Sequence, residues 1–484
     1  MLERAPVAVT FFTFIALFIG VGLYSGTRRQ DTTEDYLLAG RGVGPWFTAL
    51  SAVATGNSGF MFIGLIGFTY QMGISAVWLT VGHIVGDTLA WLSVHQRLRR
   101  VSGETQAETV SSFLGQGLAG ERWVTLLSAL ITLGFLGIYA AAQLQAGSKA
   151  MSVLFDWPAG WGVAFGAAVV AIYCIGGGIR ASIWVGSVQS VLMMVSMIAL
   201  AGVAIARSGG LGGLWAQLSA IDSSLVSLAP SGLAFGVVPF VLSWTLSGFG
   251  VVGQPPIMVR AMAIDSVEGV SAARNIYILF NAVFSVAAVA VGLTARVLLP
   301  ALAFGDAELA LPELAVALLP ALLVGLVLVG LFSATISTAD AQLLSCSAAL
   351  TQDLLPKGAL NQWALDQGPL KRITAYQAAK LGTLMMVVVV LGIALVSTDN
   401  VFVLVTFAWA ALAASLGSVM VVRVMQWRLN GAIAIAMMVS GIGTALAWRV
   451  GLHLSSDVYE VLPGMAASGL VYAIARPFLR PKAS

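Results

Sequence analysis

Long apolar stretches alternate with short polar segments along the whole chain, and this pattern predicts a bundle of membrane-spanning helices. A helix needs about 20 predominantly apolar residues to cross the hydrocarbon core of a bilayer. Thirteen stretches approach or exceed this length, which predicts one leading helix, ten core helices and two trailing helices. They comprise residues 6–24, 46–70, 73–96, 123–149, 157–175, 182–206, 231–258, 273–299, 319–351, 373–396, 400–423, 430–449 and 458–475.

The second and the seventh of these stretches are interrupted at mid-membrane depth. Ala-Thr-Gly-Asn-Ser-Gly at 54–59 breaks the first of them, and Gly and Pro residues between 247 and 256 break the other. Unwound backbone is tolerated inside a bilayer only where it is buried in protein or lines a wet cavity. Because the two breaks are five spans apart, the pair is typical of a secondary transporter with its substrate site between inverted repeats.

The same pattern divides a single transmembrane domain into four parts. A leading helix and its loop occupy residues 1–45, and the first repeat occupies 46–206. The second repeat occupies 231–423, and the trailing helices occupy 424–484. The leading helix lacks a cleavage pattern after its apolar core, so we interpret it as a retained span.

Composition supports a membrane protein and excludes several other classes. The chain is 59% hydrophobic and 9% charged, whereas a soluble domain carries about 25% charged residues. The net charge of +3 comes without a basic run, so nucleic acid is not an expected partner. Cys174 and Cys346 lie in apolar runs, which favours small packing residues over a disulfide or a metal cluster. We expect no organic cofactor and no enzymatic activity, since the apolar spans carry no nucleophile–base set.

The basic residues predict the orientation of the chain. With the amino terminus outside, 18 Lys and Arg residues fall in cytoplasmic loops and the carboxyl-terminal tail and 5 fall outside, Lys380 being left within a span. The cytoplasmic group includes Arg29, Arg260, Lys357, Lys371, Arg372, Arg480 and Lys482. Cytoplasmic loops of membrane proteins carry such an excess. We therefore expect a multi-pass protein of a cell membrane, most simply a bacterial inner membrane, with a cytoplasmic carboxyl terminus.

Several short segments, in order along nearly the whole chain, resemble the solute:sodium symporter family, and most closely its sodium/proline branch. They are Asp-Tyr-Leu-Leu-Ala-Gly-Arg at 35–41, Thr-Ala-Leu-Ser-Ala at 48–52, Tyr139, Gly-Gln-Pro at 253–255, Ser337, Thr338, Gln-Leu-Leu at 342–344, Phe-Ala-Trp-Ala at 407–410 and Asn-Gly-Ala at 430–432. The resemblance implies a five-plus-five inverted repeat of the leucine-transporter type. It also implies alternating access and uptake of a small organic solute, such as proline or another amino acid or a small carboxylate, driven by sodium.

The resemblance further implies one sodium site between the first and eighth core helices. Its expected ligands are the carbonyls of Ala54, Asn57 and Ala334 with the hydroxyls of Ser337 and Thr338. A broken helix supplies free carbonyls for a hard monovalent cation without a formal charge. The alternative is that both hydroxyls only bond to their own helix, which is common for Ser and Thr.

Two departures from the proline branch bear on the coupling ion. That branch has an aspartate in the first break and another near the start of the fifth core helix, where this chain has Gly56 and Gly186. Because a nearby carboxylate strengthens cation binding, their loss predicts weak sodium binding or a different coupling ion.

Other acids lie within spans, where an ionisable group is a functional candidate by default. Asp340 follows Ser337 by three residues and shares nearly the same helical face, so it is a candidate for ion or proton coupling. His83 and Asp87 lie four residues apart on one face of the second core helix. They are a second proton-coupling candidate, although an internal structural contact between them is the simpler interpretation.

Substrate contacts are expected around the two breaks, where free amides face any anionic group of the solute. The candidates are Ser58, Gly59, Tyr139, Gln143, Trp244, Ser247, Val251, Phe407 and Trp409. Where the proline branch has a tryptophan and a tyrosine on the second broken helix, this chain has Ser247 and Val251, which argues for a different or larger solute. Trp244, one turn earlier, is a candidate replacement if its ring faces inward.

Arg41 is a candidate inner gate with Asp35, or alternatively an interfacial anchor whose charged end reaches the headgroups. The favoured function is therefore sodium-coupled symport of a small organic solute. A proton-coupled transporter of the same fold and a transporter-like solute sensor are the alternatives. The partners expected are the solute, sodium and the lipid bilayer, and the oligomeric state is left open.

Overall fold

A computed structural model of the chain describes residues 4–28, 30, 32–230, 232–355, 375–397 and 400–479, and these residues are almost entirely helical. Within these ranges the only β-type pairing is an isolated bridge between Val43 and Ile264. The α-helices are α1 (Arg4–Gly26), α2 (Thr33–Leu38), α3 (Pro45–Gly56), α4 (Leu65–Met72), α5 (Val77–Ala90), α6 (Gln96–Thr105), α7 (Val110–Gly115), α8 (Glu121–Phe155), α9 (Ala159–Arg207), α10 (Gly210–Ile221), α11 (Val237–Phe249), α12 (Pro255–Ala263), α13 (Gly269–Leu298), α14 (Ala310–Leu318), α15 (Ala321–Ala348), α17 (Ala375–Val396), α18 (Val401–Leu412), α19 (Ser418–Val424), α20 (Gly431–Leu446) and α21 (Val461–Ala475).

Short stretches of tighter or wider helix join several of these elements. The 3₁₀ turns are Ala39–Arg41, Gly73–Ala76, Ser223–Val226, Gly250–Gly253, Pro300–Phe304, Ala307–Leu309 and Arg476–Phe478. The π-helical turns are Phe60–Gly64, Trp91–His95, Ala349–Leu354, Ala413–Gly417 and Ala447–Gly451. π-Turns inside α-helices frequently mark functional sites, and the first of these directly follows the predicted first break.

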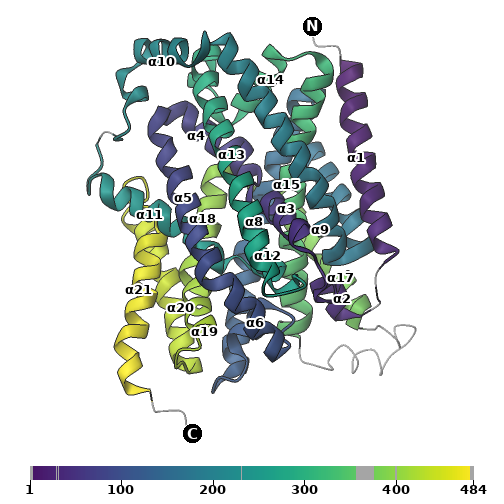
Figure 1. The fold of residues 1–484 in the computed structure, drawn as a ribbon, viewed down its shortest axis with the longest axis vertical. Helices are drawn as coiled ribbons and strands as arrows, with labels where there is room; N and C mark the ends of the chain where they lie inside the picture. Colours follow the sequence, from purple (N-terminus) through teal and green to yellow (C-terminus); the bar gives the residue numbers. More distant parts are fainter. Residues whose placement is uncertain are drawn as a thin grey trace.

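The helices form one elongated bundle with the amino terminus at one end and the carboxyl terminus at the other (Figure 1). The leading helix α1 lies along one side, and the trailing helices α20 and α21 pack against each other on the opposite side. The helix α15 lies in the middle, where it contacts α1, α3, α8 and α9 and is buried along most of its length.

The expectation of an all-helical membrane protein is confirmed, but the count of thirteen spans is not. Over the described ranges, 10 helices are long and apolar enough to cross a membrane, or 11 with the bent pair α11–α12. Two predicted spans run together from Phe60 to Thr105, and Ala159–Ile172 is shorter than a usual span. Gly73, with φ 67°, interrupts the segment from Phe60 to Thr105, and Gly178, with φ 57°, bends α9.

The first predicted break is present, and it lies where the small residues predicted it. Helix α3 ends at Gly56, Asn57 has the non-helical angles φ −84° and ψ 62°, and the chain becomes helical again at Gly59. Ser58 bonds through its hydroxyl to the amide of Phe60 at 3.2 Å, which partly replaces the helical hydrogen bonds lost at the break.

The second predicted break is also present, and it turns the chain more sharply. Helix α11 passes into a 3₁₀ turn at Gly250–Gly253, Gln254 is extended, and α12 begins at Pro255, with 57° between the two helical parts. Pro at the first positions of α12 costs no hydrogen bond because those amides lack helical partners anyway. The broken spans therefore follow from residue types that cannot continue a helix.

Two glycines one turn apart on α5 let this helix approach α11 closely. A Cβ atom at Gly82 would lie 2.9 Å from the Thr245 nitrogen, and one at Gly86 would lie 1.8 Å from the Thr245 carbonyl oxygen. From the opposite side, Gly248 of α11 faces the His83 carbonyl, with 2.1 Å to the added atom. This small-xxx-small spacing is the usual device for close helix packing in membranes.

Candidate functional site

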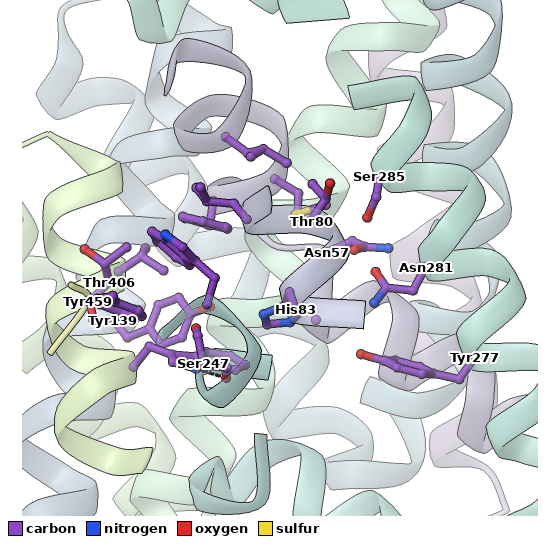
Figure 2. A pocket seen from close by; sticks show the side chains of 18 residues that line it. Asn57, Thr80, His83, Tyr139, Ser247, Tyr277, Asn281, Ser285, Thr406 and Tyr459 are labelled. Atoms are coloured by element: carbon purple, nitrogen blue, oxygen red, sulfur yellow. Dashed lines mark hydrogen bonds between the residues drawn. The ribbon is translucent and has the colours of Figure 1, made fainter. Parts of the chain in front are cut away.

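A pocket of about 600 Å³ lies between the two breaks (Figure 2). Its wall combines the first break, α5, α8, α11, α13, α18 and the segment before α21. The lining residues are Gly56, Asn57, Phe60, Met61, Leu65, Leu79, Thr80, His83, Tyr139, Trp244, Ser247, Tyr277, Asn281, Ser285, Val405, Thr406, Trp409 and Tyr459. The lining combines aromatic and other apolar side chains with a few polar groups, as is usual for small-molecule sites.

Aromatic side chains form one wall of the pocket, and four of the predicted substrate residues lie in or beside it. Tyr139, Trp244, Ser247 and Trp409 all line the pocket, so Trp244 is placed where it could take the role of the missing tryptophan. The Trp409 indole donates to the Ser247 carbonyl at 2.9 Å, and so connects α18 to the second broken helix. Trp244 stacks on Tyr459 with 4.6 Å between ring centroids.

The opposite wall is a polar stripe that the sequence analysis missed. Tyr277, Asn281 and Ser285 follow one another along α13 and point into the pocket (Figure 2). Their spacing of four residues places them on one helical face. Three polar residues at that spacing within the otherwise apolar stretch 276–293 are a signal that the sequence already contained.

Five of the predicted substrate residues do not line the pocket. The Gly59 amide donates to Gln143 Oε1 at 2.7 Å, and Ser58 shares a hydrogen bond with the Tyr139 hydroxyl at 3.3 Å, so Ser58, Gly59 and Gln143 hold the first break against α8. Val251 is fully buried in the hydrophobic core. Phe407 packs on Phe135 and lies under the Arg449 guanidinium.

Four of the five predicted sodium ligands lie together between α3 and α15, and the Thr55 carbonyl takes the place of the fifth, Asn57. Ser337 donates from Oγ to the Ala54 carbonyl at 2.9 Å and to the Ala334 carbonyl at 3.1 Å. Thr338 donates from Oγ1 to the Thr55 carbonyl and to the Ala334 carbonyl, both at 3.0 Å. The alternative that the hydroxyls bond only to their own helix is therefore wrong. Thr55 was missed.

Asn57, the fifth predicted ligand, belongs to the pocket. Its side chain is 2% exposed, lines the cavity and has an amide nitrogen, Nδ2, without a hydrogen-bond partner in the described ranges. No recorded hydrogen bond joins the Asn57 carbonyl to the hydroxyls of Ser337 or Thr338. The cluster of five oxygens consequently comprises the carbonyls of Ala54, Thr55 and Ala334 and the two hydroxyls.

Gly56 and Gly186, where the family resemblance implied acids, lie close to the pocket and the oxygen cluster. A Cβ atom at Gly186 would meet Ala54 and Ser51 at ordinary contact distances of 3.5–3.6 Å, so a side chain fits there. One at Gly56 would lie 3.1 Å from the Tyr277 hydroxyl, which therefore occupies the space that a larger residue needs.

A buried arginine lies beside the oxygen cluster. Orientation counting placed Arg260 in a cytoplasmic loop, but it belongs to α12 and is only 2% exposed. Its guanidinium donates to Ser51 Oγ at 2.6 Å, to the Pro256 carbonyl at 2.7 Å and to Ser182 Oγ at 3.0 Å. The cation thus fills the region between α3, α9 and α12. Other basic residues of that count, Arg29, Lys357, Lys371, Arg372, Arg480 and Lys482, lie outside the described residues.

Asp340, on α15, is buried and accepts a hydrogen bond from Cys174 Sγ of α9 at 3.4 Å. This contact joins α15 to α9, and the part of Asp340 in ion coupling stays a prediction. Both cysteines are buried and free.

His83 and Asp87 do not form the contact that their spacing suggested. His83 lines the pocket, with its ring 5.5 Å from the Trp409 ring. Asp87 instead accepts a hydrogen bond at Oδ2 from the Tyr277 hydroxyl at 2.6 Å. Helical spacing put the two residues on one face, but close packing of α13 against α5 gave the acid a different partner.

Arg41 joins three segments at the end of the bundle that carries α2 and α6. It donates from Nη1 to the Met262 carbonyl at 3.3 Å and from Nη2 to the Ala107 carbonyl at 2.7 Å. Its acidic partner is Glu34, with 3.6 Å between Nε and Oε1, whereas the predicted partner Asp35 pairs with Arg180. These contacts bury most of the guanidinium, which argues against the alternative that Arg41 is an anchor at the lipid headgroups.

Two interrupted helices around a central pocket define the class of secondary membrane transporters. Comparison with known proteins gives the family: residues 36–441 match the sodium:solute symporter family, and the chain belongs to it. It is 33% identical to the sodium/proline symporter of Salmonella typhimurium, over 97% of this chain and 92% of that protein. It is 29% identical to the high-affinity proline transporter PutP of Bacillus subtilis, over 92% of each chain.

Solved structures support the same fold. A sodium-coupled sialic acid symporter in its substrate-bound, outward-open state superposes with a TM-score of 0.78 at 18% identity, covering 98% of both chains. Mhp1, a nucleobase-cation-symport-1 family transporter, superposes with a TM-score of 0.56 at 15% identity, covering 93% of this chain and 96% of the other. The chain is thus a multi-pass membrane protein with the architecture of the sodium-coupled transporters.

Proposed function

We propose that this protein carries a small organic solute across the membrane by symport with sodium, through alternating access of the central pocket. The observation that carries the proposal is the contact of Ser337 and Thr338 with the carbonyls of Ala54 and Thr55 at the first break. This contact places a cluster of uncharged oxygens directly beside residues that line the pocket. Cation binding and solute binding therefore share one interrupted helix.

The oxygen cluster has the chemistry that sodium requires. Sodium is a hard cation that several neutral oxygens can hold, and the three carbonyls and two hydroxyls provide them. A bound ion would accept lone pairs from the hydroxyls of Ser337 and Thr338, whose protons would turn away from Ala54 and Thr55. The ion would then join α3 to α15 and fix the position of the first break.

The pocket favours a solute that carries acceptor oxygens. Asn57 Nδ2 and Trp244 Nε1 are buried donors with no hydrogen-bond partner among the described residues, and both side chains line the pocket. A buried unpaired donor costs about 1–3 kcal/mol, which a carboxylate or similar group of the solute would recover. An amino acid or small carboxylate fits this donor set, and the aromatic wall accommodates its apolar part.

The remaining features are assigned within the same proposal. We assign five-plus-five repeats to 46–206 and 231–423 and thirteen crossings in all, counting the short and merged helices as separate spans. An odd number of crossings agrees with the positions of the two termini at opposite ends of the bundle in Figure 1. The amino terminus faces outward and the carboxyl terminus the cytoplasm of a bacterial cell. Arg41 then lies at the inner end, where its bonds to the Met262 and Ala107 carbonyls keep that end closed.

A binding screen tests the proposal. Purified protein in detergent is heated with L-proline, other amino acids, small carboxylates or sugars, in sodium, potassium or choline chloride. Linkage predicts that the true solute raises the unfolding temperature most when sodium is present. Equal stabilisation in all three salts would contradict sodium coupling. Binding of the same solute without its uptake into proteoliposomes would indicate a sensor.

Restoring the lost acid of the fifth core helix is expected to strengthen sodium binding. In Gly186→Asp the carboxylate would lie beside Ser51 and Ala54, where it attracts the ion or compensates the Arg260 charge. We expect sodium affinity to rise roughly tenfold, or about 1.4 kcal/mol. Sodium titrations of thermal stability measure this, with Gly186→Asn as the uncharged control. Equal affinities of the two variants would show that charge at this position does not reach the site.

A further inference from the structure

Asp87 is an acid without a compensating charge. It is 0% exposed on α5, its Oδ2 atom accepts one hydrogen bond from the neutral Tyr277 hydroxyl, and its Oδ1 atom has no partner in the described part of the chain. A buried carboxylate in this situation is expensive unless a cation or a proton neutralises it.

Within the described part of the chain, no ion pair to Asp87 is present, and Arg274 of α13, one turn before Tyr277, donates instead to Asn275 Oδ1. Helix α11 and the turn Gly250–Gly253, which pack against α5, contain no titratable residue. Helix α13 presents Tyr277, and α5 itself carries His83 one turn before Asp87. His95 lies two turns after it in the following π-turn, where its Nδ1 atom is 3.0 Å from the Ala90 carbonyl and its ring stacks on Trp91.

The Tyr277 hydroxyl connects this acid to the pocket. Tyr277 lines the pocket and Asp87 does not, and the Tyr277 hydroxyl donates to Asp87 Oδ2, so this side chain links the cavity to the buried carboxyl group. The same hydroxyl is 3.1 Å from the position of a Cβ atom on Gly56. The Tyr277 hydroxyl therefore lies next to the place where the side chain of an aspartate at position 56 would begin.

We propose that Asp87 is a proton-binding site reached from the central pocket through the Tyr277 hydroxyl. A hydronium ion in the pocket transfers a proton to the Tyr277 oxygen and becomes a water molecule, and the proton already on that oxygen passes to Asp87 Oδ2. The carboxyl becomes neutral, the tyrosine keeps one proton, and release follows the reverse path. A sodium ion or a solute ammonium group would need to touch the carboxylate directly, whereas a proton crosses a hydroxyl.

The proton-binding site itself does not depend on the proposed function. Only the use of the proton does, because the proton would be carried with the solute in addition to sodium. It places proton binding at α5 and α13, on a different pair of helices from the oxygen cluster of α3 and α15. Loss of one site leaves the other in place, so the two assignments fail independently.

Infrared spectroscopy of the purified full-length protein in phosphatidylethanolamine–phosphatidylglycerol membranes tests the site. We expect the carbonyl stretching band of a protonated carboxyl group at neutral pH, and we expect Asp87→Asn to lose it. Asn is nearly isosteric and still accepts from Tyr277, and Asp265→Asn, at an exposed loop acid, is the matched control. An unchanged band in Asp87→Asn would overturn the assignment.

Transfer into deuterated buffer tests the path. Exchange of the carboxyl proton shifts the band, and Tyr277→Phe is expected to slow this shift while keeping the band, because the hydroxyl no longer relays the proton. Tyr70→Phe, which loses a hydroxyl bonded to the Leu299 carbonyl far from this pocket wall, is the control. An exchange rate in Tyr277→Phe equal to that of the control would overturn the relay, whatever the sodium response of the protein.

Discussion

Replacing Ser337 and Thr338 together with alanine is expected to remove the sodium response of the protein. Each change deletes one oxygen of the five that gather between α3 and α15. If each hydroxyl contributes about 1.5 kcal/mol, as a hydrogen bond to a charged group does, the double variant binds sodium roughly 100-fold more weakly. Sodium titrations of thermal stability, with choline balancing the ionic strength, measure the change.

Ser345→Ala is the matched control for this experiment. Ser345 lies on the same helix, and its hydroxyl bonds only to the Ala341 carbonyl of that helix at 2.9 Å. The control should keep the wild-type sodium response. A double variant that also kept it would place the ion elsewhere and remove the site from α3 and α15.

Substituting Gly86 with leucine is expected to separate α5 from α11 and destabilise the whole protein. The added Cβ atom alone would lie 1.8 Å from the Thr245 carbonyl oxygen and 2.5 Å from the Phe249 nitrogen, so backbone has to move. Overpacking of this kind costs about 3 kcal/mol or more where the neighbour is rigid. A marked fall of the unfolding temperature in detergent, and loss of folded protein in membranes, are the expected results.

Gly202→Leu on α9 provides the comparison, because a Cβ atom there meets nothing within 4 Å. Its unfolding temperature should stay close to that of the wild type. Similar unfolding temperatures for the two variants would mean that the approach of α5 to α11 is not a close backbone contact.

The breaks and the oxygen cluster could be predicted because their causes are local. Gly-Asn-Ser-Gly disfavours a continuous helix, and two successive prolines favour the start of a new one, so the residue types alone predict both breaks. Ser337 and Thr338 were found by their register within a family pattern. The Thr55 carbonyl, which joins the cluster, was missed because a backbone carbonyl carries no signature in the side chain.

The rest of the site depends on which helices meet, and the residue pattern does not state this. Asp87 was expected to contact His83, yet α13 brings Tyr277 to it. Arg260 was counted with the loops because a charge near the end of an apolar stretch resembles an interfacial residue. Only tertiary contacts with Ser51 and Ser182 show that it is internal. The polar stripe of α13 is different, since its four-residue period was readable in the sequence and was overlooked.

The interlocked glycines of α5 and α11 have a mechanical consequence. The close contact of α5 with α11 places Asp87 on the same helix pair as the second break, whereas Tyr277 belongs to α13, which packs mainly against α3, α4 and α9 and to a smaller extent against α5. A movement of α5 and α11 relative to α13 would change the distance between the carboxyl and phenol oxygens. If Asp87 holds a proton as proposed, such a movement would change the affinity of the acid for that proton and so couple proton binding to the conformational change.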